Sequence, residues 1–276
     1  MRGLSRDLDD LELTLLLEGV DQHYGYDFRQ YARVPIRRRV WRRVLEEGLG
    51  TVSGLQERVL HDPDCMQRLL VDLSVSVTSM FRDPSFYVAL RSRVVPLLRT
   101  YPFVRIWNAG CSTGEETYSL AILLREEGLA ERVRIYATDV NHAFLRCAKE
   151  GRFELDRLRE YTQHYILTGG RTSFSDYYKV CGGQARFDPT LADHVVFAQH
   201  NLVCDGSFNQ FHLIVCRNVM IYFGASLQNR VHNLFYQSLV RFGLLALGQN
   251  ESIRFTRHVD AYEEFDCREK LYRRTA

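Results

Sequence analysis

The architecture follows from one segment, Arg105-Ile-Trp-Asn-Ala-Gly-Cys-Ser-Thr-Gly-Glu-Glu-Thr-Tyr-Ser-Leu-Ala-Ile-Leu-Leu124, which reads as a buried strand, a glycine turn and an apolar helix in direct succession. A junction of this kind presents backbone N–H groups to a small polar ligand. Its glycines, Gly110 and Gly114, are spaced G-x-x-x-G rather than G-x-G-x-x-G, and Glu115 and Glu116 follow directly. Carboxylates at this place disfavour a pyrophosphate, so we expect a ligand that carries a cationic group.

Strand and helix signals alternate along the rest of the chain. Strands are expected at Val104–Ala109, Val133–Thr138, Val195–Ala198, Leu213–Cys216 and Leu244–Leu247. Helices are expected at 117–127, 141–151 and 226–242. This alternation predicts an α/β fold with a doubly wound, mostly parallel sheet that helices cover on both faces.

The domain organisation follows from where these signals are absent. Residues 1–75 carry helical periodicities without a strand signal, which predicts a small all-helical N-terminal domain. Residues 76–100 are expected to form a linker helix that starts at Asp83-Pro84. Residues 101–276 would form the α/β domain, and turn-rich aromatic pieces at about 152–194 predict a small antiparallel β insertion within it.

An arginine-rich helix marks the N-terminal domain. On a helical wheel, Arg38, Arg39, Arg42 and Arg43 fall opposite an apolar face, which predicts an arginine stripe that faces solvent. Solvated faces usually interleave glutamate with lysine. An all-arginine stripe therefore favours contact with an acidic protein, a nucleic acid or a membrane surface.

Composition limits the remaining possibilities. The net charge is +2, so any basic surface must be local, and no run of 18 apolar residues or signal-peptide pattern is present. The seven cysteines are scattered, with no C-x-x-C pair and no histidine at metal-ligand spacing. We expect a cytoplasmic protein without membrane insertion, disulfides or a bound metal.

The chemistry is expected beyond the carboxyl ends of the parallel strands, where open sheets bind their ligands. Four expected strand ends carry polar residues, namely Gly110 to Glu115, Asp139, Asn201-Leu202 and Arg217-Asn218. A carboxylate at Asp139 can accept hydrogen bonds from both hydroxyls of an adenosine ribose, and sulfonium and ammonium groups tolerate Glu115. The set favours S-adenosylmethionine, although NAD-binding sheets share the ribose carboxylate.

The strand end Cys216-Arg-Asn-Val-Met-Ile-Tyr-Phe223 narrows the methyl acceptor. Enzymes that methylate amide nitrogens usually carry an Asn or Asp followed by Pro-Pro and an aromatic residue there. Arg217 and Tyr222 instead suit an anionic oxygen such as a carboxylate, which is ionised at neutral pH and needs orientation more than a strong base. Arg82 comes just before the linker helix, where its side chain could reach over the sheet to the same acceptor. Taken alone, Arg82 is better explained by a salt bridge to Asp83 or to another surface acid.

Five blocks of sequence resemble, in order and spacing, the chemotaxis receptor methyltransferases of the CheR type. They are Ser76-Val-Thr-Ser-Met-Phe-Arg82, Gly110-Cys-Ser-Thr-Gly-Glu-Glu116, Ala137-Thr-Asp-Val140, Asn201-Leu202 and Cys216-Arg-Asn-Val-Met-Ile-Tyr-Phe223. The resemblance covers nearly the whole chain. It implies a Rossmann-like fold and S-adenosylmethionine-dependent O-methylation of glutamate side chains on receptor signalling helices, with S-adenosylhomocysteine as product.

The resemblance also implies a set of site residues. The cofactor residues would be Ser76, Thr78, Arg82, Gly110, Glu115, Asp139, Asn201, Leu202, Arg217 and Asn218, with Arg82 and Tyr222 beside the reacting methyl and carboxylate. Ser76 departs from the family, because better-known members have Asn there and a hydroxyl cannot replace both contacts of an amide.

Partners are implied in the same way. Arg38, Arg39, Arg42 and Arg43 match the receptor-facing helix of the family, and acidic methylation regions of receptors would complement their charge. The β insertion matches a subdomain that in some members captures a peptide of the receptor's C-terminal tail by strand addition, although Thr168–Phe187 is longer here. We expect a monomer.

Two other classes of function stay open at this point. A methyltransferase of the same fold could act on a protein outside chemotaxis or on a nucleic acid, with the arginine stripe on phosphates. A non-catalytic module could sense the cofactor and dock on a receptor, which the intact Arg82, Asp139 and Tyr222 disfavour.

Overall fold

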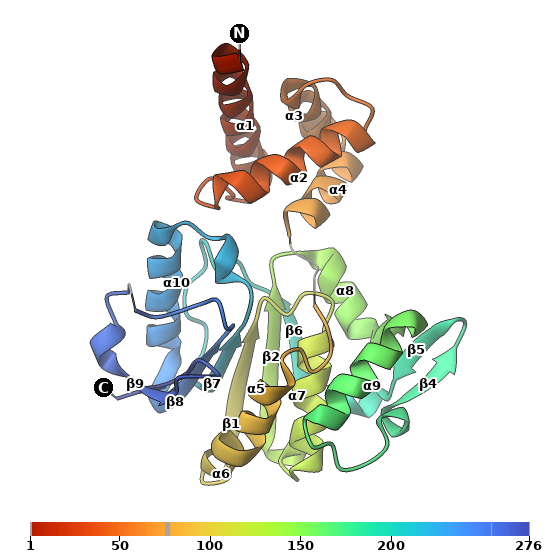
Figure 1. The fold of residues 1–276 in the computed structure, drawn as a ribbon, viewed down its shortest axis with the longest axis vertical. Helices are drawn as coiled ribbons and strands as arrows, with labels where there is room; N and C mark the ends of the chain where they lie inside the picture. Colours follow the sequence, from red (N-terminus) through yellow and green to blue (C-terminus); the bar gives the residue numbers. More distant parts are fainter. Residues whose placement is uncertain (1, 75–77, 255, 276) are drawn as a thin grey trace. The chain divides into compact units, whose positions relative to one another are not determined.

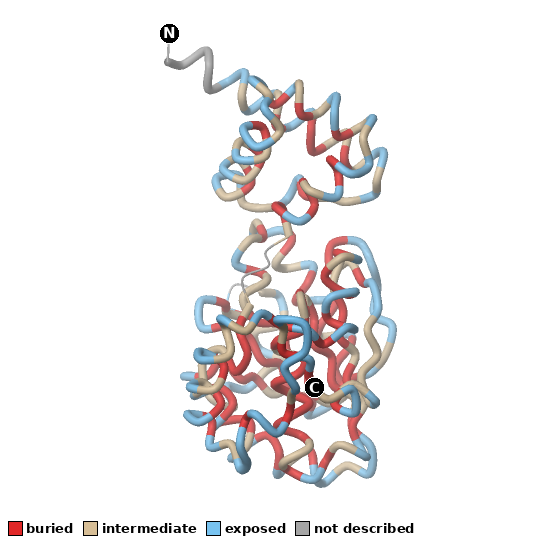
Figure 2. The backbone as a smooth tube through the Cα atoms, turned by 90° about the vertical axis from the view of Figure 1, so that its right-hand side faces the viewer, coloured by how far each residue is buried: buried red, intermediate tan, exposed pale blue. Residues whose placement is uncertain are grey.

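The computed structural model describes residues 2–74, 78–254 and 256–275 (Figure 1). The chain divides into two compact units. The first comprises Met1–Val75 with Ile221–Arg230, and the second comprises Ser76–Met220 with Val231–Ala276. Buried positions occur in both units (Figure 2).

The N-terminal part of the first unit is all-helical, as predicted. Its helices are α1 (Arg2–Tyr24), α2 (Arg33–Glu46), α3 (Val52–His61) and α4 (Pro63–Leu73). Thr51 caps α3 by accepting a hydrogen bond from the N–H of Gly54, and Asp62 caps α4 ahead of a proline at its first position. One apolar stripe from each helix meets in a shared core that includes Leu16, Val40 and Leu69.

The second unit contains a seven-stranded sheet in the order β6-β2-β1-β7-β8-β10-β9. Its strands are β1 (Val104–Ala109), β2 (Val133–Asp139), β6 (Val195–Gln199), β7 (Phe211–Cys216), β8 (Leu239–Leu247), β9 (Tyr262–Asp266) and β10 (Leu271–Arg274). The first five strands pair in parallel, which confirms the doubly wound sheet. The antiparallel pairs β8–β10 and β9–β10 were not predicted, because β9 and β10 are short and rich in charged residues.

Helices cover this sheet much as the sequence indicates. They are α5 (Pro84–Ala89), α6 (Val95–Leu98), α7 (Glu115–Glu126), α8 (His142–Glu150) and α10 (Ala225–Ser238). The predicted linker helix is real but contains a π-helical turn at Leu90–Val94, just before Pro96. Proline lacks an N–H group and its ring crowds the carbonyl four residues earlier, so the regular hydrogen-bond ladder cannot continue there.

The helix predicted for 226–242 ends early, and that part of the prediction is wrong. Helix α10 stops at Ser238 and β8 begins at Leu239. The pairing of β7 with β8 then shifts between Phe211 and Leu213, where the extra residues of β8 form a bulge. Phe242 adopts a φ of 65° in this bulge, a conformation that no sequence pattern signals.

The predicted β insertion is confirmed as a three-stranded antiparallel sheet in the order β3-β5-β4. Its strands are β3 (Arg152–Glu154), β4 (Tyr178–Cys181) and β5 (Gln184–Phe187). The insertion also contains a helix, α9 (Leu158–Leu167), that was not predicted. Its aromatic residues, which the sequence suggested belonged to strands, include Tyr161 and Tyr165, and both are fully buried.

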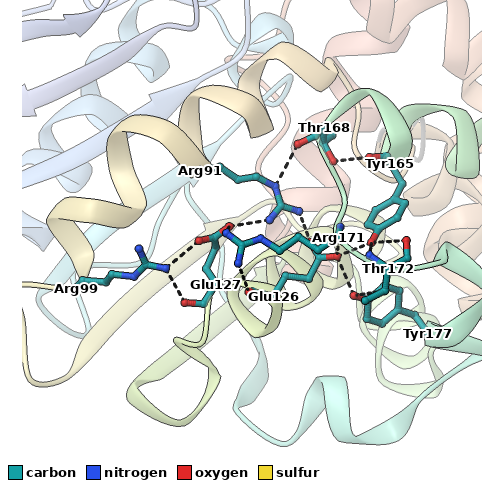
Figure 3. A network of polar contacts seen from close by, with 9 residues as sticks. All are labelled: Arg91, Arg99, Glu126, Glu127, Tyr165, Thr168, Arg171, Thr172 and Tyr177. Carbon is teal, nitrogen blue, oxygen red and sulfur yellow. Dashed lines mark hydrogen bonds and ion pairs between the residues drawn. The ribbon is translucent and has the colours of Figure 1, made fainter.

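A charged network attaches the insertion to the α/β core (Figure 3). Glu126 and Glu127 lie at the end of α7 with side chains only 3% and 4% exposed. Glu126 accepts hydrogen bonds from the hydroxyls of Tyr165 and Tyr177 in the insertion. Three arginines supply the positive charges. Arg91 pairs with both glutamates, and Arg99 pairs with Glu127. Arg171 donates its backbone N–H to Glu126 and pairs with Glu127 through its side chain. Negative charge at a helix C-terminus is unfavourable unless cations compensate it. Because these cations come from other segments, the network connects the end of α7 to the segment with Arg91 and Arg99 and to the insertion.

The described residues give no sign of a membrane span or a metal site. None of their helices combines the length and the apolar character that a membrane crossing requires. Nor do their His, Cys, Asp and Glu side chains form a cluster that could hold a metal ion.

A buried histidine, His232, is expected to make the second unit less stable in acid. His232 on α10 is 2% exposed, and burial, with the nearby charge of His258, lowers its pKa to about 4. The unfolded chain therefore binds a proton between that value and the ordinary pKa of about 6.5, where the folded protein does not. The contribution of neutral His232 to the free energy of unfolding is fully present above the ordinary pKa, and it is lost as the pH falls toward 4.

We therefore expect wild-type protein to lose about 2 kcal/mol more than His232→Gln when the pH falls from 7.5 to 5. Urea unfolding of both proteins at each pH measures the difference. An equal loss in the two proteins would show that His232 does not control the acid sensitivity.

Candidate active site

The glycine turn after β1 requires its glycines for space and for backbone conformation. Gly110 has a φ of 74°, and a Cβ there would lie 2.6 Å from Cγ2 of Val219. Gly114 has a φ of 100°, and a Cβ there would lie 2.9 Å from Cβ of Ala148 on α8. The turn therefore fits closely between α8 and the loop after β7, and its N–H groups lie at the start of α7.

Asp139, at the end of β2, is bonded to this turn. Its Oδ2 accepts the N–H of Ser112 at 2.9 Å, and its Oδ1 accepts the N–H of Asn141 at 2.9 Å. Burial raises the pKa of the carboxyl, and these backbone N–H groups act in the opposite direction. A carboxylate has about four lone-pair positions, so Asp139 keeps acceptor capacity for the hydroxyls of a ligand.

Glu115, the first residue of α7, is a buried carboxylate with few partners. Its Oε2 accepts the Thr113 hydroxyl at 2.7 Å, and its Oε1 lies 3.4 Å from the hydroxyl of Tyr161 and 4.0 Å from Nη1 of Arg157. Burial is the main cause that raises the pKa of Glu115. Such a carboxylate suits a cationic ligand group, because a buried negative charge is costly until it is paired.

The segment Thr78–Asp83 carries strained backbone on both sides of Arg82. Phe81 has a φ of 52° and Asp83 a φ of 57°, which is unusual for any residue with a side chain and especially for a phenylalanine. The hydroxyl of Ser119 on α7 accepts the N–H of Phe81 at 2.9 Å. Strain of this kind persists only where the surroundings impose it, and it is concentrated at functional sites.

Helix α9 of the insertion and the turn before it hold the same segment from another side. Arg157 donates to the carbonyl of Thr78 at 2.8 Å, and Glu160 accepts the hydroxyl of Ser79 at 2.5 Å. His164 is hydrogen-bonded through Nδ1 to the carbonyl of Met80 at 3.1 Å. Residues 157, 160 and 164 lie one turn apart, so one face supports three consecutive residues of the segment.

Arg217 fixes the other end of the segment and is not free to bind an acceptor. Its guanidinium pairs with Glu116 at 2.8 Å and with Asp83 at 2.7 Å, and it donates to the carbonyl of Arg82 at 3.1 Å. It also lies 4.1 Å from the ring centre of Phe86, and its side chain is 2% exposed. Burial lowers the pKa of Arg217, but the two carboxylates outweigh it and keep the group charged.

The expectation that Arg217 faces an anionic acceptor therefore needs correction. Glu116, which pairs with Arg217, is itself held by the protein. Its second oxygen accepts a hydrogen bond from the side-chain amide of Asn108 in β1 at 2.8 Å. The hydroxyl of Thr117 donates to the amide oxygen of Asn108 at 2.7 Å. Both Asn108 and Thr117 are buried. The second glutamate after the turn thus connects Arg217 to Asn108 in β1.

Glu251 holds the loop after β7 and was missed by the sequence reasoning. Its carboxylate accepts the N–H groups of Asn218 and Val219 at 2.9 Å, and those of Met220 and Gly248 at 2.7 Å. Asn218 has a φ of 61°, so this loop is held in a strained form. No motif signals Glu251, since it lies more than thirty residues beyond the loop that it binds.

Asn201 and Leu202 follow β6, next to β2 in the sheet. Asp139 is in register with Gln199, which places Asn201 just beyond the end of β2. The Asn201 side-chain oxygen accepts the N–H of Val203 at 2.9 Å, and Leu202 is buried. The remaining predicted residue, Ser76, lies outside the described residues.

Tyr222 and the arginine helix belong to the first unit. The carbonyl of Tyr222 accepts the N–H of Ala32 at 2.8 Å, and the guanidinium of Arg39 lies 4.9 Å from the centre of its ring. The relation of Tyr222 to Arg82 stays a prediction.

The predicted solvent-facing stripe holds for Arg38 and Arg42 but is wrong for Arg43. Arg38 is exposed, whereas the side chain of Arg43 is 12% exposed and pairs with the buried carboxylate of Asp72 at 2.6 Å. Arg42 is 56% exposed, although it also pairs with Asp72. The buried Asp72 on α4 needs compensation, and the wheel alone cannot show which arginines supply it.

We expect Arg217→Gln to lower the free energy of unfolding by about 3–5 kcal/mol, because it leaves Glu116 and Asp83 without their cation. The double variant Arg217→Gln/Glu116→Gln is expected to recover part of the loss, since one uncompensated carboxylate is then absent. Urea unfolding provides the comparison. If Arg217→Gln lowered the free energy of unfolding by less than about 1 kcal/mol, Arg217 would not be the cation that compensates Glu116 and Asp83.

Two family models together match most of the chain. The family model described as "CheR methyltransferase, SAM binding domain" matches residues 76–270. A second model, "CheR methyltransferase, all-alpha domain", matches residues 11–74.

Relatives with similar sequences cover most of the chain. Cher3 of Pseudomonas putida, named as a methyltransferase, is 47% identical over 266 residues, which are 96% of this chain and 97% of that protein. The chemotaxis protein methyltransferase 2 of Pseudomonas aeruginosa is 30% identical over 83% of this chain and 80% of its own length. A 104.1 kDa protein of Rhodobacter capsulatus is 30% identical over 82% of this chain, which spans 24% of that larger protein. The chain belongs to the CheR methyltransferase family.

Proposed function

We propose that this protein transfers the methyl group of S-adenosylmethionine to glutamate side chains on the cytoplasmic signalling helices of chemoreceptors. The products are a glutamate methyl ester and S-adenosylhomocysteine. One observation carries the proposal, namely that the strained segment around Arg82 is clamped by a second arginine whose own charge is already neutralised. The names of the chemotaxis relatives support the choice of receptor.

The chain offers a fitting site for the cofactor. Asp139 keeps acceptor capacity beside the glycine turn. Glu115 is a buried carboxylate whose nearest cation, Arg157, is 4.0 Å away. The turn packs so closely against Val219 and Ala148 that a Cβ at Gly110 or Gly114 would clash, which fixes its backbone N–H groups at the start of α7. In the proposal Asp139 binds the ribose hydroxyls and Glu115 the ammonium group, with Thr78, Asn201 and Leu202 beside them. The bound sulfonium would supply an electrophilic methyl group.

The protein's own part in the reaction is to bind, orient and desolvate the acceptor. A glutamate carboxylate is ionised at neutral pH, so no proton has to be removed when its oxygen forms the new bond to carbon and the bond from carbon to sulfur breaks. Arg82 would attract the carboxylate, and the hydroxyl of Tyr222 would donate to the oxygen that does not react. Correct placement of the two reactants alone can lower a barrier by roughly 7–11 kcal/mol.

Partner surfaces belong to the same proposal. Arg38 and Arg42 are the exposed members of the arginine helix and would meet acidic receptor helices. Strand β4 is one of the two outer strands of the insertion and is exposed at Val180, so a strand from a receptor tail could pair with it. We place the protein in the cytoplasm as a monomer without a metal, with domain limits near residues 75, 100, 152 and 194.

A nucleic-acid substrate receives less support from the contacts. Arg43 is mostly buried in an ion pair with Asp72, so the arginine helix offers fewer exposed cations than the sequence suggested, and affinity for a phosphate backbone rises with the number of cations in contact. Transfer of radiolabelled methyl groups to receptor cytoplasmic fragments, released by mild base, tests the proposal directly. Labelling of RNA instead, or of no receptor fragment while the cofactor still binds, would refute it.

We expect Tyr222→Phe to lower kcat about 10- to 100-fold with little change in the dissociation constant of S-adenosylhomocysteine, because the hydroxyl would act only on the acceptor. Tyr101→Phe, which keeps its ring against His212, serves as the matched control. Steady-state methylation and calorimetry provide the two values. Equal kcat values in both variants would remove Tyr222 from the mechanism.

Glu115→Gln is expected to weaken binding of S-adenosylhomocysteine roughly 10- to 100-fold, because a charge-assisted bond to the ammonium is lost. The same variant should unfold at higher urea when no ligand is present. Burial raises the folded-state pKa of Glu115, so its ionisation above the unfolded pKa costs stability. Weaker binding together with lower stability would point to a structural role instead.

A further inference from the structure

We infer that Arg39 is a positioning residue that holds the ring of Tyr222 in one orientation. The inference rests on the proposed function, in which Tyr222 acts on the acceptor carboxylate. It separates Arg39 from the receptor-facing arginines with which the sequence grouped it.

The backbone of Tyr222 is attached to the loop between α1 and α2. Its carbonyl accepts the N–H of Ala32 at 2.8 Å, and the next two residues continue the contact. Phe223 forms an antiparallel bridge with Tyr31, and the two rings lie 4.8 Å apart. The carbonyl of Gln30 accepts the N–H of Gly224 at 2.8 Å, so the main chain of this segment is fixed residue by residue.

Close approach of the two chains explains a glycine in the segment. A Cβ on Gly224 would lie 2.8 Å from the carbonyl oxygen of Gln30. A side chain there would push the bridge apart and move Tyr222 with it. The segment Ile221–Arg230 therefore groups with the N-terminal helices as one compact unit.

Backbone contacts do not determine where the tyrosine ring points. Tyr222 is partly exposed, and its side chain can turn about χ1 while the carbonyl stays bonded. Arg39 supplies the missing contact, since the centre of its guanidinium lies 4.9 Å from the ring centre. That distance is within the range of a cation–π interaction, which restricts the ring without using its hydroxyl.

The guanidinium of Arg39 is itself held in place. Its Nη1 donates to the carbonyl of Leu73, the last residue of α4, at 3.1 Å. A cation at a helix C-terminus is favourable, because the last carbonyls lack partners within the helix. Arg39 is thus fixed between a helix end and an aromatic ring, and its planar group is partly buried.

The neighbouring arginines have other partners. Arg43 pairs with Asp72 at 2.6 Å, and Arg42 pairs with the same carboxylate. Arg38 is exposed on the outer side of α2. Arg38 is therefore the natural comparison, since it has the same charge, lies next to Arg39 in the chain and belongs to the proposed docking surface.

Kinetics separate positioning from docking. Arg39→Leu is expected to lower kcat about tenfold while KM for the methylated receptor fragment changes less than twofold. Arg38→Ala is expected to raise KM instead. In a Tyr222→Phe background, Arg39→Leu should cause no further loss of kcat. An increase in KM alone for Arg39→Leu, matching that of Arg38→Ala, would overturn the inference.

A spectroscopic measurement tests the contact without any acceptor. With 3-fluorotyrosine at position 222, we expect one narrow fluorine resonance that shifts and broadens in Arg39→Leu but not in Arg38→Ala. An unchanged spectrum in Arg39→Leu would overturn the inference. Arg39→Lys controls for the helix end, because lysine can still donate to the carbonyl of Leu73 but lacks the planar group. We expect Arg39→Lys to be more stable to urea than Arg39→Leu, while its fluorine resonance stays as broad as in Arg39→Leu.

The two levels of the proposal fail in different ways. Full activity of Tyr222→Phe would remove the catalytic role of Tyr222, whereas the fluorine spectrum would still report whether Arg39 holds the ring. Loss of activity in Tyr222→Phe, combined with a normal kcat in Arg39→Leu, would uphold the proposed function and overturn the inference.

Discussion

The buried guanidinium of Arg217 is the contact on which the candidate site depends. It neutralises Glu116 at the start of α7 and Asp83 before α5, and it binds the carbonyl of Arg82. Burying one cation between two carboxylates stabilises little by itself, since desolvation offsets most of the attraction. Its main effect is on geometry, because one planar group connects the start of α7 to the strained segment and, through Glu116, to β1.

The insertion has a structural role that its position in the sequence conceals. Arg157, Glu160 and His164 bind three consecutive residues of the segment that carries Arg82. The network around Glu126 and Glu127 anchors the other end of α9 to the core (Figure 3). A subdomain that resembles a docking module therefore also supports strained backbone, and changes in its attachment would be felt at the site.

The arginines of α2 differ in their partners. Four arginines look equivalent on a helical wheel, yet Arg43 compensates a buried aspartate, Arg39 lies over an aromatic ring and Arg38 faces solvent. A buried carboxylate such as Asp72 is costly unless it is paired, and Arg42 and Arg43 supply the pairing charges. Arg38 and Arg42 stay exposed, although Arg42 also pairs with Asp72.

The sequence alone was sufficient to predict the order of strands and helices, the glycine turn, Asp139 and the β insertion, because periodicity, caps and strand ends are local features. It could not predict α9, whose aromatic residues suggested strands, or β9 and β10, which are short and rich in charged residues. Nor could it predict the contacts of Glu251 or the partners of Arg217, since these depend on residues far apart in the chain. Glu251 binds N–H groups about thirty residues away, and Arg217 meets Asp83 more than a hundred residues away. Local pattern determined where polar and charged residues follow the strands. Tertiary packing decided which of those charges are paired within the protein, as Arg217 is with Asp83 and Glu116.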